Sequence, residues 1–159
     1  MPIIYLALAS NLGDREKHLH DALSRLSKFV DAARVSSIYE TASADDHTRI
    51  LHQVCGGITD LKPIDVFRHV RRIEKEMGRI DGLRSNPRPI DIDVLLYDRV
   101  IDLSPALTIP HPRLHERATV LIPLAEIAPD VKHPRLRMTI RELLRQMDTS
   151  DIVQLYKKI

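Results

Sequence analysis

The 159-residue sequence predicts an α+β fold, with a ferredoxin-like mixed or antiparallel sheet and helices packed on its faces. Two observations lead to this fold class. Apolar runs of strand length and segments of helical periodicity follow one another in the order β-α-β-β-α-β, extended by a short strand, two helices and a last strand. This order is neither a strict alternation of strands and helices nor a succession of strands alone. The length is that of one domain with a real core, so we expect a single domain over residues 1–159.

The N-terminal part of the chain predicts a strand, a turn and an amphipathic helix. Ile3–Ala9 is a short apolar run that ends at the turn cluster Ser10–Asp14. Asp14 can cap the helix that follows, because a short acceptor side chain bonds the free amides of a first helical turn. The apolar face of this helix has helical spacing and consists of Leu19, Ala22, Leu23, Leu26 and Phe29.

The next elements are two strands and a second helix. Val35–Glu40 and Ile50–Thr59 read as strands, and Gly56-Gly57 in the second of them marks a bulge or a close approach of backbones. The helix begins at Lys62-Pro63, because proline suits the first turn, and ends at Gly78.

The rest of the chain predicts shorter elements around one central strand. In chain order they are a loop at 79–89, the central strand within 87–97, a turn near Asp98-Arg99, a short strand Val100–Asp102, a largely helical stretch Leu114–Ala128, a helix opened by the capping box Thr139–Glu142 and ending near Met147, and a final strand Ile152–Tyr156.

The composition excludes several classes of protein. A net charge of +2 creates no strong field for nucleic acid or a membrane surface, so we expect neither partner. No apolar run reaches membrane-spanning length, and no signal-peptide pattern opens the chain. The single cysteine, Cys55, rules out an internal disulfide and suits a reducing compartment. We therefore expect a cytoplasmic monomer that acts on small molecules.

The central strand carries the most informative pattern. Ile90, Ile92 and Val94 alternate with Asp91 and Asp93, so both carboxylates project from one face, roughly 7 Å apart at their Cα atoms. Paired carboxylates on a buried strand repel one another unless a cation lies between them. Mg²⁺ takes one or two carboxylates and completes its shell with water and phosphate oxygens. Two solvated aspartates on an edge strand are the alternative.

Two further segments would bring cationic groups to this strand if the loop ends lie together. The 79–89 loop carries Arg79, Arg84 and Arg88, and is either a solvated connector or a lid that closes over phosphates. Residues 110–117 read Pro-His-Pro-Arg-Leu-His-Glu-Arg and add His111 and Arg117. Carboxylates, a metal, arginines and a histidine are the groups that phosphoryl-type transfer needs. The sequence contains no glycine-rich P-loop or dinucleotide fingerprint.

The two motifs together resemble those of the 6-hydroxymethyl-7,8-dihydropterin pyrophosphokinase family of folate biosynthesis. The motifs are Pro-Arg-x-x-Asp-x-Asp at residues 87–93 and Pro-His-Pro-Arg-x-x-x-Arg at residues 110–117, and the likeness extends over almost the whole chain. The resemblance implies transfer of a pyrophosphoryl group, the β and γ phosphates together, from ATP to the hydroxymethyl group of the pterin, with release of AMP.

The resemblance also implies roles for individual residues. Asp91 and Asp93 would hold two Mg²⁺ ions around the triphosphate, and Arg79 and Arg88 would close onto the phosphates. These four residues are the catalytic set. The implied ATP-binding residues are Glu74, Arg88, Leu95, Thr108, Ile109, His111 and Arg117. The implied pterin-binding residues are Thr41, Ala42, Ala44, Ile50, His52, Asp91 and Thr119.

The departures from the family pattern gather on the pterin side. Where the family has an aromatic residue, Leu and Asn in the third strand, this chain has Ile50, Leu51 and His52, and Thr119 replaces a second aromatic. Those two aromatics stack on the pterin ring in the family, and the Asn binds its edge. His52 can take the Asn role, because imidazole donates and accepts hydrogen bonds. The other departures are Ala9, residues 42–45, Asp81 (with Arg84 as a substitute), Ser85 and Asn86.

Three functions therefore stay open at this point. The first is pyrophosphoryl transfer to 6-hydroxymethyl-dihydropterin. The second is the same chemistry on a modified, for example methylated, pterin that serves another one-carbon carrier, because Ile50 and Thr119 leave more room than two aromatics. The third is an ATP- or pterin-binding homologue with impaired catalysis, which the intact Asp-x-Asp disfavours, since an unused pair of buried carboxylates costs stability.

Overall fold

The computed structural model describes residues 1–42, 47–78, 88–147 and 153–159. In the described part, the strands are β1 (Ile3–Ser10), β2 (Asp31–Val35), β3 (Ile38–Ala42), β4 (Arg49–Ile58), β5 (Asp91–Tyr97) and β6 (Gln154–Lys157). The helices are α1 (Arg15–Leu26), α2 (Pro63–Glu76), the short 3₁₀ helix η1 (Leu114–Glu116), α3 (Ala118–Ile127) and α4 (Ile140–Arg145).

The strands form one six-stranded sheet in the order β5-β1-β4-β3-β6, and β2 also pairs with β4. Every pairing among these strands is antiparallel. Two crossovers, through α1 and α2, leave β1 between β4 and β5, which is the ferredoxin-like arrangement. The predicted α+β fold class is therefore confirmed, with an antiparallel sheet.

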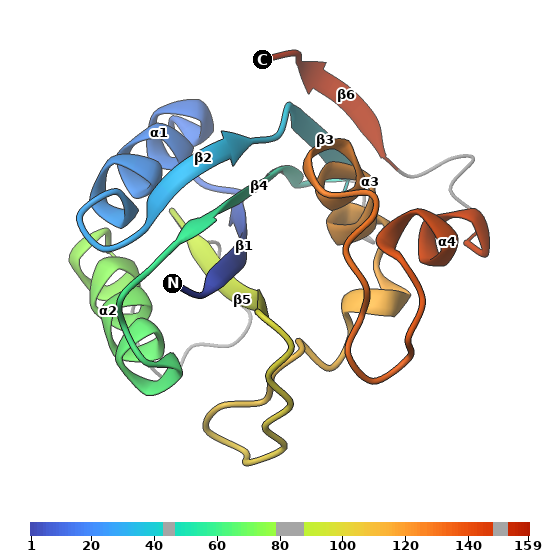
Figure 1. The fold of residues 1–159 in the computed structure, drawn as a ribbon. Coiled ribbons are helices and arrows are strands. Elements are labelled where there is room, and N and C mark those ends of the chain that lie inside the picture. Colours follow the sequence, from blue (N-terminus) through green and yellow to red (C-terminus); the bar gives the residue numbers. More distant parts are fainter. Residues whose placement is uncertain (43–46, 79–87, 148–152) are drawn as a thin grey trace.

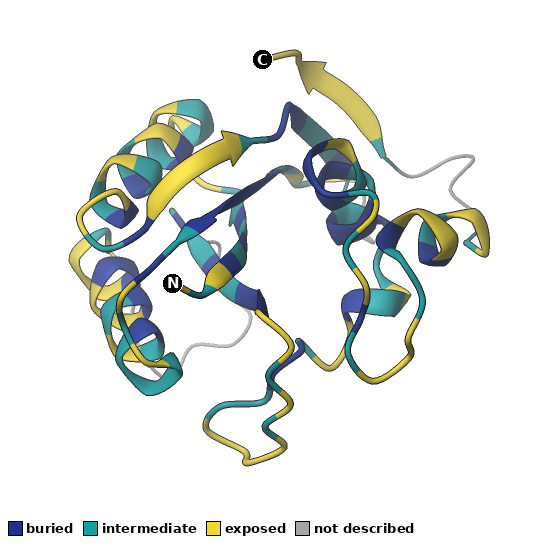
Figure 2. Ribbon diagram, viewed as in Figure 1, coloured by how far each residue is buried: buried dark blue, intermediate teal, exposed yellow. Residues whose placement is uncertain are grey.

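The helices cover the two faces of the sheet (Figure 1), and each layer has its own apolar core. Helices α1 and α2 lie on one face, over Ile4, Leu6 and Leu8 of β1, which are almost completely buried. Helices α3 and α4 lie on the other face, where Leu121 and Leu124 are fully buried. Figure 2 shows the buried residues gathered on the inner strands of the sheet and on the inner sides of these helices, whereas β2 and β6 are largely exposed. Among the described residues, no helix is long and apolar enough to cross a membrane.

The glycine pair in β4 is a close approach of two backbones, as the sequence predicts. A Cβ atom on Gly57 would lie 2.1 Å from the carbonyl oxygen of Asp31 and 2.7 Å from the Cα of Ala32, both in β2. The register of β2 against β4 shifts between Ala32 and Arg34, opposite this pair. The predicted helix end at Gly78 is also confirmed, since this residue has a φ of 106° directly after the cap residue Met77.

The prediction of a single strand over Val35–Glu40 is wrong. The chain forms β2 up to Val35 and β3 from Ile38, with Ser36 and Ser37 between them. The Ser36 hydroxyl accepts the amide of Val54 at 2.9 Å and donates to the carbonyl of Ser37 at 2.8 Å. The Ser36 hydroxyl thus accepts a hydrogen bond that a strand carbonyl would otherwise accept. As a result, β2 and β3 pair with β4 in two different registers.

Two other predictions need correction. The strand predicted at Val100–Asp102 is only an isolated bridge between Asp102 and Ile109. The helical stretch predicted over Leu114–Ala128 is divided into η1 and α3, because Arg117 between them has an extended backbone, with φ −115° and ψ 112°. The capped last helix is confirmed as α4, where the Thr139 hydroxyl accepts the Glu142 amide at 3.1 Å.

Candidate active site

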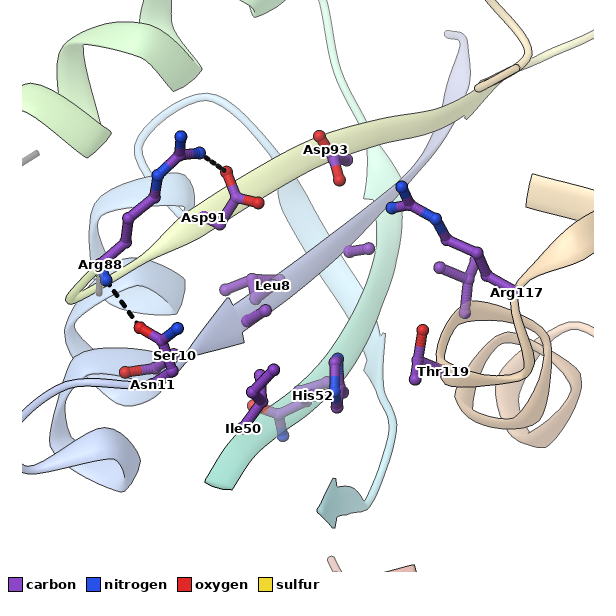
Figure 3. A pocket seen from close by; sticks show the side chains of 14 residues that line it. Leu8, Ser10, Asn11, Ile50, His52, Arg88, Asp91, Asp93, Arg117 and Thr119 are labelled. Atoms are coloured by element: carbon purple, nitrogen blue, oxygen red, sulfur yellow. Dashed lines mark hydrogen bonds and ion pairs between the residues drawn. The ribbon is translucent and has the colours of Figure 1, made fainter. Parts of the chain in front are cut away.

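A cavity of about 220 Å³ opens on the sheet face that carries α3, over the end of β1 (Figure 3). Its floor is made of Ala7 and Ala9, whose side chains alternate with the buried Leu6 and Leu8 of the other face. Small floor residues leave room that larger side chains would fill. Among the described residues, the lining consists of Ala7, Leu8, Ala9, Ser10, Asn11, Ile50, His52, Gln53, Arg88, Asp91, Asp93, Arg117, Thr119 and Val120.

The sheet register aligns functional groups across this floor. On β5, Asp93 lies opposite Ala7 of β1, and Asp91 lies opposite Ala9 of β1. On the other side of β1, His52 of β4 lies opposite Ala9. Adjacent strands are about 4.8 Å apart, so Asp91 and His52 flank the cavity roughly 10 Å from each other. The alternating pattern in β5 therefore places a carboxylate pair on one wall, and the register of β4 places the His52 imidazole on the other.

The aspartate pair is half-buried and electrostatically strained. The side chains of Asp91 and Asp93 are 38% and 37% exposed. Burial raises the pKa of the Asp93 carboxyl above its usual range, and the Asp91 carboxylate raises it further. His111 and Arg117 act in the opposite direction. A carboxyl that burial and a neighbouring carboxylate both keep from ionising is a site that a bound cation would stabilise.

His111 points toward this pair from the segment before η1. Its backbone amide donates to the Leu95 carbonyl at 2.9 Å, and its Nδ1 accepts the Arg113 amide at 3.1 Å. The proton of the neutral ring is therefore on Nε2, which lies 3.8 Å from Oδ2 of Asp93. Burial lowers the pKa of His111, against the opposing effect of Asp93.

Arg88 and Arg117 bring positive charge to the cavity. Arg88 lies just before β5, and its guanidinium is 3.5 Å from Oδ1 of Asp91. Arg117 lies between η1 and α3, where its side chain faces Asp93 in Figure 3. The cavity thus combines two carboxylates with two guanidinium groups, which suits an anionic ligand that carries a cation with it.

Three of the predicted pterin-binding residues occupy the wall opposite the two aspartates. Ile50, His52 and Thr119 line the cavity, and the hydroxyl of Thr41 lies 2.8 Å from Nε2 of His52. Burial and, to a smaller extent, Arg117 lower the pKa of His52 to about 4, so its ring is neutral at physiological pH. Thr41 holds this ring from β3 and is itself buried.

The structure places several predicted residues away from the cavity lining. Glu74 of α2 is 1% exposed, and its carboxylate accepts the Ile92 amide at 3.0 Å and the Arg71 guanidinium at 3.1 Å. It therefore supports β5 between the two aspartates. This strand, predicted as the central one, is an edge strand of the described sheet, next to β1. The other predicted residues outside the lining also have structural contacts. Leu95 and Ile109 are fully buried, the Thr108 hydroxyl donates to the Ser104 carbonyl, and Ala42 ends β3. Arg79 and Ala44 lie outside the described residues.

Sequence reasoning missed the contribution of β1 and of the turn after it. Ala7, Ser10, Asn11 and Gln53 line the cavity although no role was predicted for them. The available signal was the alternation of Leu with Ala in β1, which indicates a face with space above it.

Comparison with known proteins gives a family match over most of the chain. Residues 5–129 match the family model described as 7,8-dihydro-6-hydroxymethylpterin-pyrophosphokinase (HPPK). The 2-amino-4-hydroxy-6-hydroxymethyldihydropteridine pyrophosphokinase of Aquifex aeolicus is 35% identical over 144 residues, which are 89% of this chain and 90% of that protein. The Bacillus subtilis protein of the same name is 40% identical over 82% of this chain and 80% of its own length.

Other similar proteins are much longer. The Folic acid synthesis protein FOL1 of Dictyostelium discoideum is 38% identical over 89% of this chain, but the chain spans only 22% of its length. Among solved structures, wild-type HPPK-DHPS of Plasmodium falciparum has a TM-score of 0.74 at 16% identity, over 91% of this chain and 44% of that one. The structural likeness supports the fold, and the family match with the two bacterial relatives establishes the kinship. The chain therefore belongs to the 7,8-dihydro-6-hydroxymethylpterin pyrophosphokinase family.

Proposed function

We propose that this protein transfers a pyrophosphoryl group from ATP to the hydroxymethyl group of 6-hydroxymethyl-7,8-dihydropterin, a step of folate biosynthesis. The observation that carries the proposal is the wall formed by Asp91 and Asp93, with Arg88, His111 and Arg117 directed to it. The names of the bacterial relatives supply the reaction, and the described geometry supplies groups suited to a triphosphate.

The residues present fit magnesium as a companion of ATP. Among the described residues no group of three or more His, Cys, Asp or Glu could form an all-protein metal site. Asp91 and Asp93 supply two carboxylates, which is the number Mg²⁺ takes when phosphates and water complete its shell. Bound there, Mg²⁺ would neutralise charge on phosphate oxygens. We propose that the active protein is a cytoplasmic monomer that uses ATP as co-substrate and binds two Mg²⁺ ions.

The chain's own residues then have distinct tasks. The reaction forms a bond from the pterin hydroxymethyl oxygen to the β-phosphorus and breaks the bond from that phosphorus to the oxygen that leaves with AMP. The hydroxyl proton is released to solvent. Arg88 and Arg117 would bind phosphate oxygens and spread the negative charge, because guanidinium offers paired donors. His111 would donate from Nε2, the nitrogen that faces the cavity wall. Further contacts with ATP stay predictions for Glu74, Leu95, Thr108, Ile109 and Arg79.

The acceptor would lie between β4 and the start of α3. Its ring would lie against Ile50 and Thr119, and its polar edge would face His52, which Thr41 holds in place. Because Ile50 and Thr119 leave more room than two aromatic side chains, a pterin with an added alkyl group is a second candidate acceptor for the same chemistry. The position of Asp91 beside Ala9 would bring the hydroxymethyl group close to the phosphates.

A single assay tests the proposal. The purified protein is incubated with ATP, Mg²⁺ and 6-hydroxymethyl-dihydropterin, and AMP is followed by chromatography. Prompt AMP release that needs all three components supports the proposal. AMP release only with a methyl-substituted hydroxymethylpterin supports the second acceptor. Absence of AMP with both acceptors, despite Mg²⁺-dependent binding of an ATP analogue, would contradict the proposed activity.

The buried imidazole of His52 predicts how the free energy of unfolding depends on pH. Its pKa is lowered to about 4 in the folded protein from 6.5, so the unfolded chain takes up a proton first as the pH falls. The stabilisation is complete above pH 6.5 and is lost progressively down to about pH 4, by up to about 3 kcal/mol. His52→Asn retains polar groups without this titration. Urea unfolding at pH 7 and pH 4.5 should therefore show a smaller acid-induced loss in the variant than in the wild type. Equal losses would contradict a buried neutral imidazole.

A further inference from the structure

We propose that Asn11 is a positioning residue that fixes Arg88 at the cavity, an inference that rests on the proposed role of Arg88 in binding ATP. The amide of Arg88 donates to Oδ1 of Asn11 at 2.6 Å, and the amide of Asn11 donates to the carbonyl of Arg88 at 3.3 Å. These two bonds join the turn after β1 to the residue before β5, across 77 positions of sequence. Both residues line the cavity.

The sequence around Arg88 explains why a side chain is needed here. Arg88 lies between Pro87 and Pro89, and proline has no backbone N–H. The amide of Arg88 is therefore the single backbone donor in this tripeptide. The regular pairing of β1 with β5 ends at Ala9 and Asp91, so the backbone ladder does not reach it. Asn11 continues the connection with its side-chain oxygen, two residues beyond the last ladder pair.

This connection determines where the guanidinium of Arg88 can go. The side chain is 26% exposed and reaches Oδ1 of Asp91 at 3.5 Å (Figure 3). An arginine side chain has many rotamers, so a backbone that also moved would hold the guanidinium poorly. With its backbone bonded to β1, Arg88 starts from a fixed point beside the aspartate pair. Asn11 thus acts on ATP through Arg88.

Two other roles for Asn11 are distinguishable. In one, its side-chain amide contacts a ligand directly; in the other, it only stabilises the turn. A double-mutant cycle separates these from positioning, because residues that act through one another are not additive. The four proteins are wild type, Asn11→Ala, Arg88→Ala and the double variant. The first readout is the affinity for a non-hydrolysable ATP analogue with Mg²⁺, measured by calorimetry.

We expect Asn11→Ala to weaken analogue binding by about tenfold, as for one lost hydrogen bond to a half-buried partner. In the Arg88→Ala background, the same change should weaken binding by less than about twofold. Equal losses in both backgrounds would overturn the inference, because Asn11 would then act independently of Arg88.

The second readout is hydrogen exchange of the Arg88 amide, followed by NMR. Exchange should accelerate about tenfold or more in Asn11→Ala and stay slow in Asn11→Asp, whose carboxylate still accepts the bond. Unchanged exchange in Asn11→Ala would overturn the inference. Asn11→Asp also keeps the test open should Asn11→Ala fail to fold. Absence of analogue binding in the wild type would refute the proposed function, and the exchange experiment would still decide the role of Asn11.

Discussion

Replacing Asp93 with alanine is expected to abolish AMP release while leaving the protein folded. Asp93 lies between His111 and Asp91 on the wall that we assign to the triphosphate. Removal of one preorganised electrostatic group from such a site lowers turnover by about 10²- to 10³-fold or more. Turnover is measured as AMP formed with ATP, Mg²⁺ and the accepted pterin.

The same change should stabilise the free protein slightly. Burial and Asp91 raise the pKa of Asp93, so the folded state disfavours its charged form at neutral pH. A neutral side chain removes this cost, as at many active sites that exchange stability for function. Thermal unfolding of Asp93→Ala and Asp93→Asn should therefore occur at or above the temperature of the wild type. The control is Asp60→Asn, at an exposed residue between β4 and α2 that should keep full activity. Retained turnover in Asp93→Ala would contradict the assignment of Asp91 and Asp93 to the triphosphate site.

Replacing Gly57 with alanine is expected to be the most destabilising change in the sheet, by about 3–5 kcal/mol. Its new Cβ would lie 2.1 Å from the Asp31 carbonyl oxygen, and backbone of β2 cannot rotate away as a side chain can. Strand β2 would have to separate from β4. Urea unfolding with a shared slope for wild type and variant measures the loss.

Gly56→Ala is the matched control one residue earlier. Its Cβ would meet the Tyr5 ring, 2.5 Å from Cε1, but a side chain can turn aside at a smaller cost. We expect a loss of about 1–2 kcal/mol, within the range for overpacking. Equal losses of stability in the two variants would contradict the inference that β2 approaches β4 too closely at Gly57 for a side chain.

Elements with a strong local period could be predicted from the sequence. The apolar stripe of α2 and the alternation in β5 each depend on neighbouring residues alone. The break between β2 and β3 could not, because Val35-Ser36-Ser37-Ile38 reads as a continuous strand. Its position depends on Val54, which bonds the Ser36 hydroxyl and belongs to a distant strand. Local pattern does not contain this information.

The candidate site divides in the same way. That Asp91 and Asp93 share a face follows from a spacing of two in a strand, and the sequence by itself determined it. Which groups face them was decided only by the tertiary structure. The sheet order puts β1 between β4 and β5, so that His52 and Asp91 flank Ala9. The bond from Asn11 to Arg88 likewise joins residues 77 positions apart. Side-chain period is a local property of the backbone, whereas strand order and register arise from long-range pairing, which only the folded chain specifies.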